Sequence, residues 1–225
     1  MRMRRKKYLD ERVQNVNDMI IVIEGEEFFK KSEEEKFNLI DLKGVFGNDN
    51  PVHLEIGCGK GAFAINMAKL HPEINFLAVE KLTNVIIAGA ESLSKEGLDN
   101  VRFLNLSAQN LLYYLKERSI EKIYLNFSCP YPKNTYANHR LTSPRFLALY
   151  KKLLQDNGTV SQKTDNDNFF EYSIECFNNN GYTIDFMTTD LHAHKEIPNV
   201  MTEYEEKFVK LNKNINYLLA HPNRE

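Results

Sequence analysis

The sequence lacks the features that would place it in a membrane or in an oxidising compartment. No apolar run approaches the roughly 18 residues of a membrane span, and the basic residues 1–7 have no apolar segment behind them. Cysteine is scarce, because Cys58, Cys129 and Cys176 form an odd and scattered set without zinc-ligand spacing. We therefore expect a cytoplasmic protein in a reduced compartment, with no metal and no membrane partner.

An excess of charge of one sign is also missing. The 225 residues carry 29 Lys and Arg against 31 Asp and Glu, a net charge of −2. This balance excludes a uniformly basic nucleic-acid binder and leaves room for local basic patches. Basic residues gather at the start of the chain, namely Arg2, Arg4, Arg5 and Lys6, and residues 24–36 are acidic. The basic stretch is either a solvated terminus or an arm that contacts phosphate.

Three glycines at alternate positions mark the stretch around which the chain is organised, Glu55-Ile56-Gly57-Cys58-Gly59-Lys60-Gly61. Residues 52–54 before it are apolar like a buried strand, and residues 62–70 after it have the apolar spacing of a helix. Such a turn exposes backbone N–H groups and the positive end of the helix. It lies where doubly wound sheets bind nucleotide-like ligands.

Two kinds of ligand fit this turn. Residues 57–62 also match the dinucleotide pattern G-x-G-x-x-G/A, so a nicotinamide or flavin enzyme is an alternative. Glu55 argues against it, because an acid there repels a pyrophosphate and suits a cationic amino-acid ligand. Glu80 lies 23 residues after Gly57, a spacing that suits hydrogen bonds from ribose hydroxyls in either kind of ligand.

Strands and helices alternate through the remainder of the chain. Strand patterns occur at residues 52–54, 75–80, 101–106, 122–127, 159–162 and 182–188, with helix patterns between them and a final strand expected within 202–211. Repeated β–α units predict an α/β fold with a doubly wound, mostly parallel, seven-stranded sheet. The turn-rich residues 44–51 separate an N-terminal extension, 1–50, with its basic arm and a helical segment, from a main domain, 51–225.

A proline-rich loop follows the fourth of these strands, with the sequence Asn126-Phe127-Ser128-Cys129-Pro130-Tyr131-Pro132-Lys133. Two prolines around an aromatic ring make a stiff loop at the ligand-binding edge of the sheet. His139 and Arg140 follow it as candidate phosphate contacts. The simpler alternative is a proline-stiffened turn with Tyr131 packed into the core.

Several motifs, in order over nearly the whole chain, resemble the bacterial tRNA (guanine-N7)-methyltransferases, a family of class I methyltransferases with a Rossmann-like fold. They are Glu-x-Gly-x-Gly-x-Gly at 55–61, the proline loop, Lys163-Thr164-Asp165-Asn166, Asp190-Leu191-His192 and Met201-Thr202-Glu203-Tyr204-Glu205. The resemblance implies methyl transfer from S-adenosylmethionine, with S-adenosylhomocysteine as product, to N7 of a variable-loop guanosine in tRNA. The oligomeric state it implies is a monomer or a homodimer.

The resemblance also implies roles for individual residues. Cofactor contacts would come from Glu55, Gly57, Gly59, Glu80, Ser107 and Cys129. Guanosine contacts would come from Lys133, Asp165, Thr202, Glu203, Tyr204 and Glu205, and RNA contacts from Arg2, Arg4, Arg5, Lys6, His139 and Arg140.

This chain departs from the family pattern at the position treated as catalytic, where Cys129 replaces Asp. Ser107 stands where an Asp is usual, Tyr131 replaces a usual Trp, and the basic stretch after the proline loop is thinned. Methylating N7 needs no proton removal, because the nitrogen already exposes a lone pair. We therefore expect slow but real turnover, and the alternative is a methyltransferase-like tRNA-binding protein that has lost it.

Overall fold

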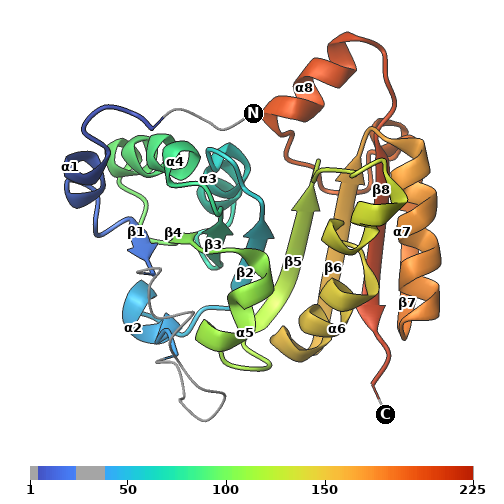
Figure 1. Cartoon of the computed structure of the whole chain (residues 1–225), viewed down its shortest axis with the longest axis horizontal. Helices are drawn as coiled ribbons and strands as arrows, with labels where there is room; N and C mark the ends of the chain where they lie inside the picture. Colours follow the sequence, from blue (N-terminus) through green and yellow to red (C-terminus); the bar gives the residue numbers. More distant parts are fainter. Residues whose placement is uncertain (1–4, 24–38, 225) are drawn as a thin grey trace. The chain divides into compact units, whose positions relative to one another are not determined.

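The computed structural model describes residues 5–23 and 39–224 (Figure 1). The predicted RNA contacts Arg2 and Arg4 and the acidic residues 24–36 lie outside the described residues. None of the helices in the described ranges is long and apolar enough to cross a membrane.

In the described residues, strands and helices alternate, and the strands form one mixed, mostly parallel sheet of eight strands. The strands are β1 (Ile20–Val22), β2 (Val52–Ile56), β3 (Asn75–Val79), β4 (Val101–Asn105), β5 (Ile120–Asn126), β6 (Leu154–Thr164), β7 (Tyr182–Thr188) and β8 (Asn216–Pro222). Their order is β1-β4-β3-β2-β5-β6-β8-β7. The α/β class is therefore confirmed, and the expected count of seven strands is wrong by one.

The helices fill the intervals between the strands. The α-helices are α1 (Leu9–Gln14), α2 (Leu42–Phe46), α3 (Ala62–Leu70), α4 (Thr83–Glu96), α5 (Leu111–Tyr114), α6 (Pro144–Leu153), α7 (Asp167–Asn179) and α8 (Glu203–Lys210). Short 3-10 helices are η2 (Ala108–Asn110), η3 (Asn134–His139) and η4 (Leu191–Ala193).

The chain divides into two compact units. Unit 1 comprises Met1–Val52 with Ile56–Lys116, and unit 2 comprises His53–Glu55 with Glu117–Glu225. The expected division into 1–50 and 51–225 stays a prediction.

In unit 1, β4 pairs in parallel with β3 on one side and with β1 on the other. β1 is one of two strands that the sequence did not predict, the other being β8. Its three apolar residues, Ile20–Val22, show no periodicity of their own. Leu77, Ile86 and Phe103 are fully buried, and the ring of Phe103 lies against Gly89 of helix α4. The carboxyl ends of the strands and the glycine turn are thereby held on a rigid support.

In unit 2, β5 pairs in parallel with β6 and with the middle of β2, while β8 runs antiparallel between β6 and β7. The last strand is β8, so the strand expected within 202–211 is wrong. That segment forms α8 because Thr202 and Glu205 make a reciprocal capping box. The spacing of Thr202 and Glu205, three positions apart as in a capping box, is the signal that the sequence offered for this helix.

Candidate active site

The glycine turn of unit 1 follows β2 and requires glycine at three positions. Gly57, Gly59 and Gly61 have φ of 78°, 59° and 73°, in the left-handed region that other residues rarely adopt. The amides of Gly57 and Cys58 both donate to the carbonyl of Val79, at 2.8 and 3.0 Å. These bonds fasten the turn to the end of β3.

The three glycines differ in what surrounds them. A Cβ on Gly61 would overlap the ring of Phe103, whereas a Cβ on Gly57 or Gly59 would meet no atom within 4 Å. On the neighbouring helix α4, a Cβ on Gly89 would overlap the carbonyl oxygen of Lys60. Gly61 therefore lets the turn approach Phe103 of β4 closely, and Gly89 lets α4 approach the turn. Gly57 and Gly59 leave open space beside the turn.

Glu80, the acid predicted to bind ribose, lies directly after β3 and is partly exposed. Its Oε1 accepts a hydrogen bond from the amide of Leu82 at 3.0 Å, which fixes the carboxylate beside the start of α4. Asn105 at the end of β4 donates to the Glu80 carbonyl at 2.9 Å and accepts from the Thr83 hydroxyl at 2.9 Å. Ser107 follows, half-buried, at the start of η2.

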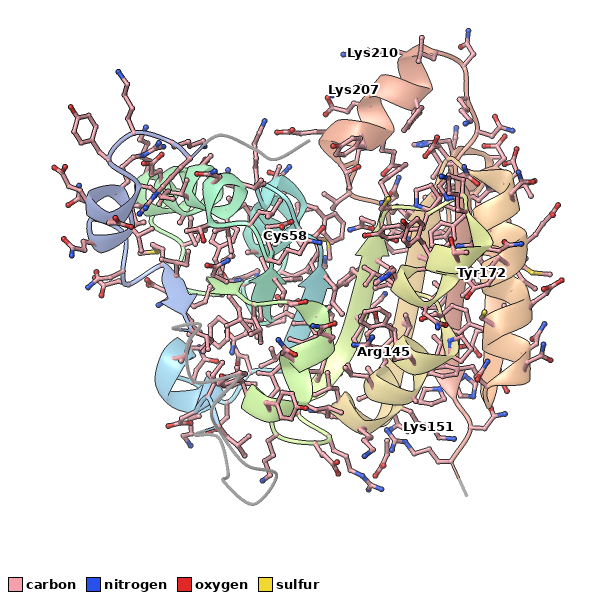
Figure 2. All side chains as sticks on the ribbon, in the orientation of Figure 1. Cys58, Arg145, Lys151, Tyr172, Lys207 and Lys210 are labelled. Atoms are coloured by element: carbon pink, nitrogen blue, oxygen red, sulfur yellow. The ribbon has the colours of Figure 1, made fainter. Side chains whose placement is uncertain are left out.

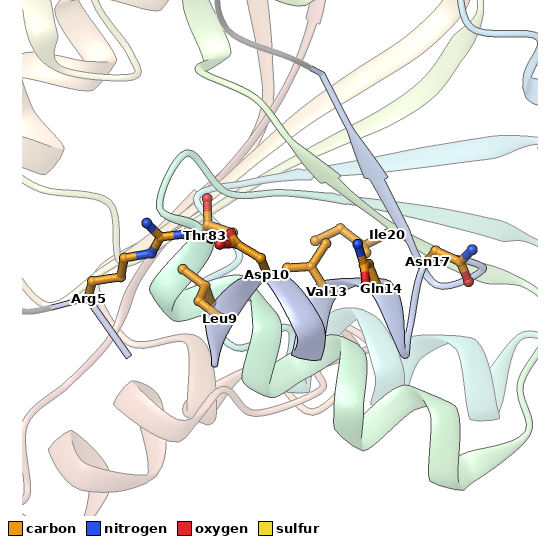
Figure 3. A pocket seen from close by; sticks show the side chains of 8 residues that line it. All are labelled: Arg5, Leu9, Asp10, Val13, Gln14, Asn17, Ile20 and Thr83. Carbon is orange, nitrogen blue, oxygen red and sulfur yellow. Dashed lines mark hydrogen bonds and ion pairs between the residues drawn. The ribbon is translucent and has the colours of Figure 1, made fainter. Parts of the chain in front are cut away.

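A cavity of about 590 Å³ opens beside this edge of unit 1 (Figure 3). The side chains that line it come from the N-terminal segment and from α4, namely Arg5, Leu9, Asp10, Val13, Gln14, Asn17, Ile20 and Thr83. Arg5 forms an ion pair with Asp10 within this lining.

Residues 5–23 are held within unit 1 by defined contacts, so this part of the basic N-terminus is not frayed. The Lys6 amide donates to Asn84 Oδ1 at 3.0 Å, and β1 joins the sheet. Arg12 donates to both oxygens of Glu91 at 2.6 and 2.7 Å, and this pairing lowers the pKa of Glu91 below its ordinary value. Arg5 is exposed and Lys6 is half-buried.

Glu55 occupies a buried position on β2 in unit 2. It is 5% exposed, and its Oε1 accepts a hydrogen bond from Asn126 Nδ2 at 3.0 Å. Asn126 is the last residue of β5, so this bond links the ends of two neighbouring strands. The sequence did not identify Asn126 as a functional residue.

The proline loop after β5 contains two non-glycine residues in the left-handed region, Phe127 with φ 49° and Tyr131 with φ 42°. Backbone strain of this kind is concentrated at functional sites. Between them Cys129 is exposed, and Lys133 is exposed at the end of the loop. The loop thus presents the two predicted contacts to solvent.

His139 and Arg140 were both predicted to contact RNA, and the structure places them differently. His139 is exposed, with its ring centroid 5.7 Å from that of Tyr131 and 5.9 Å from that of Tyr136. Arg140 is 8% exposed, and its guanidinium donates to the backbone carbonyls of Pro130 and Tyr131. In this arrangement Arg140 faces the proline loop.

Glu205 is fully buried and makes contacts within unit 2. One carboxylate oxygen accepts from Lys163 Nζ at 3.0 Å, and the other accepts from Asn199 Nδ2 at 2.6 Å and lies 3.1 Å from His192 Nε2. The Thr202 amide also donates to this carboxylate within the capping box. Lys163, His192 and Asn199 are thus structural partners to which the sequence gave no role.

Lys163 is the cation of this buried network. It is 6% exposed at the end of β6, and its ammonium also donates to the Val200 carbonyl at 2.9 Å and to Asn199 Oδ1. Burial lowers its pKa below the ordinary value, an effect that the attraction of Glu205 opposes. Strand β6 is rich in polar residues, so its sequence carries no signal that Lys163 is buried.

The other predicted guanosine contacts lie close to these groups in the chain. Asp165 follows β6 and pairs with Lys213 at 3.1 Å, with a carboxylate that is about one quarter exposed (26%). Tyr204 is 59% exposed, and its ring stacks on that of Phe127 with centroids 6.3 Å apart. Glu203 is exposed on the first turn of α8, and Thr202 caps that helix. Helix α8 therefore contacts the proline loop through Tyr204.

Among the described residues, no group of three or more His, Cys, Asp and Glu side chains could hold a metal ion.

Comparison with solved structures identifies the fold. An antibiotic-related methyltransferase aligns with a TM-score of 0.63 and 15% identity, covering 84% of this chain and 96% of that chain. The 16S rRNA methyltransferase KamB aligns with a TM-score of 0.63 and 12% identity, over the same shares. The fold is that of the class I methyltransferases.

Comparison of sequences identifies the family. A family model described as "Putative methyltransferase" matches residues 49–218. The tRNA (guanine-N(7)-)-methyltransferase of Oceanobacillus iheyensis is 43% identical over 208 residues, which are 92% of this chain and 92% of the relative. The protein of the same name from Geobacillus thermodenitrificans is 46% identical over 164 residues, 73% of this chain and 76% of the relative. This chain therefore belongs to the tRNA (guanine-N7)-methyltransferase family.

Proposed function

We propose that this protein methylates N7 of a variable-loop guanosine in tRNA, with S-adenosylmethionine as the methyl donor. The observation that carries the proposal is the glycine turn with open space above it, in a chain that aligns with the Oceanobacillus iheyensis relative over 92% of its length. When bound, the donor supplies a methyl group on a positively charged sulfur, and S-adenosylhomocysteine is the product.

The residues of the turn fit this donor. Gly57 and Gly59 leave room for a ligand against the backbone, because even a Cβ there would meet no protein atom within 4 Å. We assign the ribose hydroxyls to the Glu80 carboxylate and the adenine side to Ser107, at the ends of adjacent strands. Glu55 suits the donor's amino group, since a buried carboxylate attracts a cation strongly.

The acceptor nitrogen determines how much chemistry the protein must supply. Guanine N7 carries an in-plane lone pair and no proton, so the reaction needs no general base. The bond from N7 to the methyl carbon forms as the bond from carbon to sulfur breaks, and the positive charge passes from sulfur to the guanine ring. Holding the two atoms in line contributes up to about 7–11 kcal/mol.

We assign guanosine and RNA recognition to exposed and partly exposed groups, most of them in unit 2. The Asp165 carboxylate is suited to accept the N–H donors on the Watson–Crick edge of guanine, and Lys133 is exposed beside the proline loop. Within the Thr202–Glu205 stretch, Tyr204 offers an exposed ring, whereas Thr202 and Glu205 hold α8 in place. RNA contacts are assigned to the exposed His139 and, in unit 1, to Arg5 and Lys6.

Cys129 distinguishes two versions of this function. Since the thiol accepts a hydrogen bond only weakly, it replaces the family's carboxylate poorly in orienting guanine. We propose slow turnover, because positioning by other residues remains. The second candidate, tRNA binding without turnover, is favoured by the same replacement of Asp by Cys129.

Titration calorimetry tests the donor assignment. S-adenosylmethionine or S-adenosylhomocysteine should bind, and Glu80→Ala should weaken binding by about 1–3 kcal/mol because the ribose hydroxyls lose their acceptor. Glu91→Ala, on the same unit but paired with Arg12, serves as the control and should leave the affinity unchanged. Binding of NAD and of neither methionine compound would refute the proposal.

A further inference from the structure

The proline loop holds a conformation that its own sequence does not favour. Tyr131 has φ 42°, although it is a bulky residue, and Phe127 has φ 49°. Pro130 and Pro132 have no N–H, so the loop has few donors with which to stabilise itself. Contacts from elsewhere must therefore maintain its shape.

Arg140 supplies such contacts through a planar fork of donors. Its Nε donates to the Pro130 carbonyl at 2.9 Å, and its Nη2 donates to the Tyr131 carbonyl at 3.0 Å. The two acceptors are the backbone carbonyl oxygens just before and just after the strained φ angle of Tyr131. A lysine, with one nitrogen and no fork, cannot reproduce this geometry.

Tyr172, which Figure 2 labels on α7, is a further partner of Arg140. The guanidinium carbon of Arg140 lies 4.2 Å from the centroid of the Tyr172 ring, a cation–π contact. The Arg140 side chain thus has loop carbonyls on its fork and an aromatic ring against it, and only 8% of the residue is exposed. Little of this cation is accessible to an RNA phosphate.

We propose that Arg140 is a positioning residue for methyl transfer. It maintains the conformation of the loop from Cys129 to Lys133 and does not bind RNA phosphate. The inference rests on the proposed function, because the loop carries the position that orients guanosine. Tyr172 acts with Arg140 by fixing the plane of its guanidinium.

The test compares Arg140→Lys and Arg140→Ala with Arg145→Ala, a matched variant at an exposed arginine on α6 (Figure 2). We expect both Arg140 variants to lower kcat at least about tenfold. The salt dependence of tRNA binding should stay that of the wild type. Arg140→Lys should resemble Arg140→Ala, because the fork matters and the charge does not.

Hydrogen exchange of the amides of Phe127, Ser128, Cys129 and Tyr131 gives a second readout that does not depend on turnover. Exchange should be faster in Arg140→Lys and in Tyr172→Leu than in the wild type, and unchanged in Arg145→Ala. Arg140→Lys and Tyr172→Leu still test the inference if Arg140→Ala fails to fold. If the wild type transfers no methyl group, the proposed function fails, while the exchange still tests the role of Arg140 in the loop.

Two results would overturn the inference. One is an Arg140→Lys variant with wild-type kcat, tRNA affinity and loop exchange. The other is an Arg140→Ala variant whose salt slope for tRNA binding falls by about one, the signature of a lost phosphate contact.

Discussion

Replacing Glu205 with glutamine tests whether its carboxylate is a structural group of unit 2. The side chain is 0% exposed, and it lies 3.0 Å from the ammonium of Lys163, which is itself 6% exposed. Glu205→Gln keeps the size of the side chain and removes its charge, so that Lys163 is left as a buried cation without its anion. Breaking a buried pair in this way costs about 3–5 kcal/mol.

The surroundings place the expected loss at the lower end of this range. Lys163 keeps hydrogen bonds to the Val200 carbonyl and to Asn199, and the amide of the new glutamine can still accept one. We therefore expect the free energy of unfolding to fall by about 3 kcal/mol. Denaturant unfolding without any ligand measures this as a lower midpoint at an unchanged slope.

Glu206→Gln is the matched control, because Glu206 is an exposed acid on the first turn of the same helix. It should cost less than about 1 kcal/mol, the value of a charge near a helix N-terminus. Combining Glu205→Gln with Lys163→Met should cost less than the sum of the two single changes, because the pair is then removed together. If Glu205→Gln leaves stability unchanged and only raises KM for tRNA, the carboxylate serves the substrate and the structural account is wrong.

Three further predictions address the turn, the loop and a buried tyrosine. Gly59→Ala and Gly97→Ala both place alanine at positive φ in open space, so each should lower the free energy of unfolding by about 1 kcal/mol. Only Gly59→Ala should weaken S-adenosylmethionine binding in calorimetry, and equal affinities of the two variants would show that the ligand does not bind at the turn. Cys129→Asp should raise the rate of methyl transfer about tenfold or more, since a charged acceptor contributes about 1.5–3 kcal/mol, and Cys129→Ser should change little; a Cys129→Ala variant without any activity would instead give the thiol a chemical role. Burial raises the pKa of Tyr217 from 10.0 to about 12, so its contribution to stability is complete below pH 10 and is lost as the pH rises toward 12. Several buried tyrosines titrate late, and tyrosinate absorbance should show one late-titrating group fewer in Tyr217→Phe than in the wild type; identical titrations would contradict this.

The repeated β–α pattern predicted most of the fold. The strands at 75–79, 101–105 and 182–188 lie within one residue of their expected bounds, because the first two are rich in apolar residues and the third alternates apolar with polar residues. The boundary between α6 and β6 could not be predicted from turn residues. Asn157-Gly158 reads as a helix end, but Gly158 lies within β6, where a Cβ would sit 3.0 Å from two carbonyl oxygens.

The candidate site was predictable where local geometry decides it and not where tertiary contacts do. The positive φ of Gly57 and Gly59 follows from the glycines themselves. The burial of Arg140 depends on the loop carbonyls and on Tyr172, which is 32 positions away in the sequence. Its basic character suggested a phosphate contact, because composition does not reveal which partner a cation finds.

The most direct test of the proposed function is identification of the methylated nucleoside. The purified protein is incubated with labelled S-adenosylmethionine and unmodified tRNA, and the RNA is digested to nucleosides and separated. We expect label in 7-methylguanosine from the variable loop, formed slowly by the natural protein and faster by Cys129→Asp. Label in a different nucleoside, or none with either protein, would contradict the account.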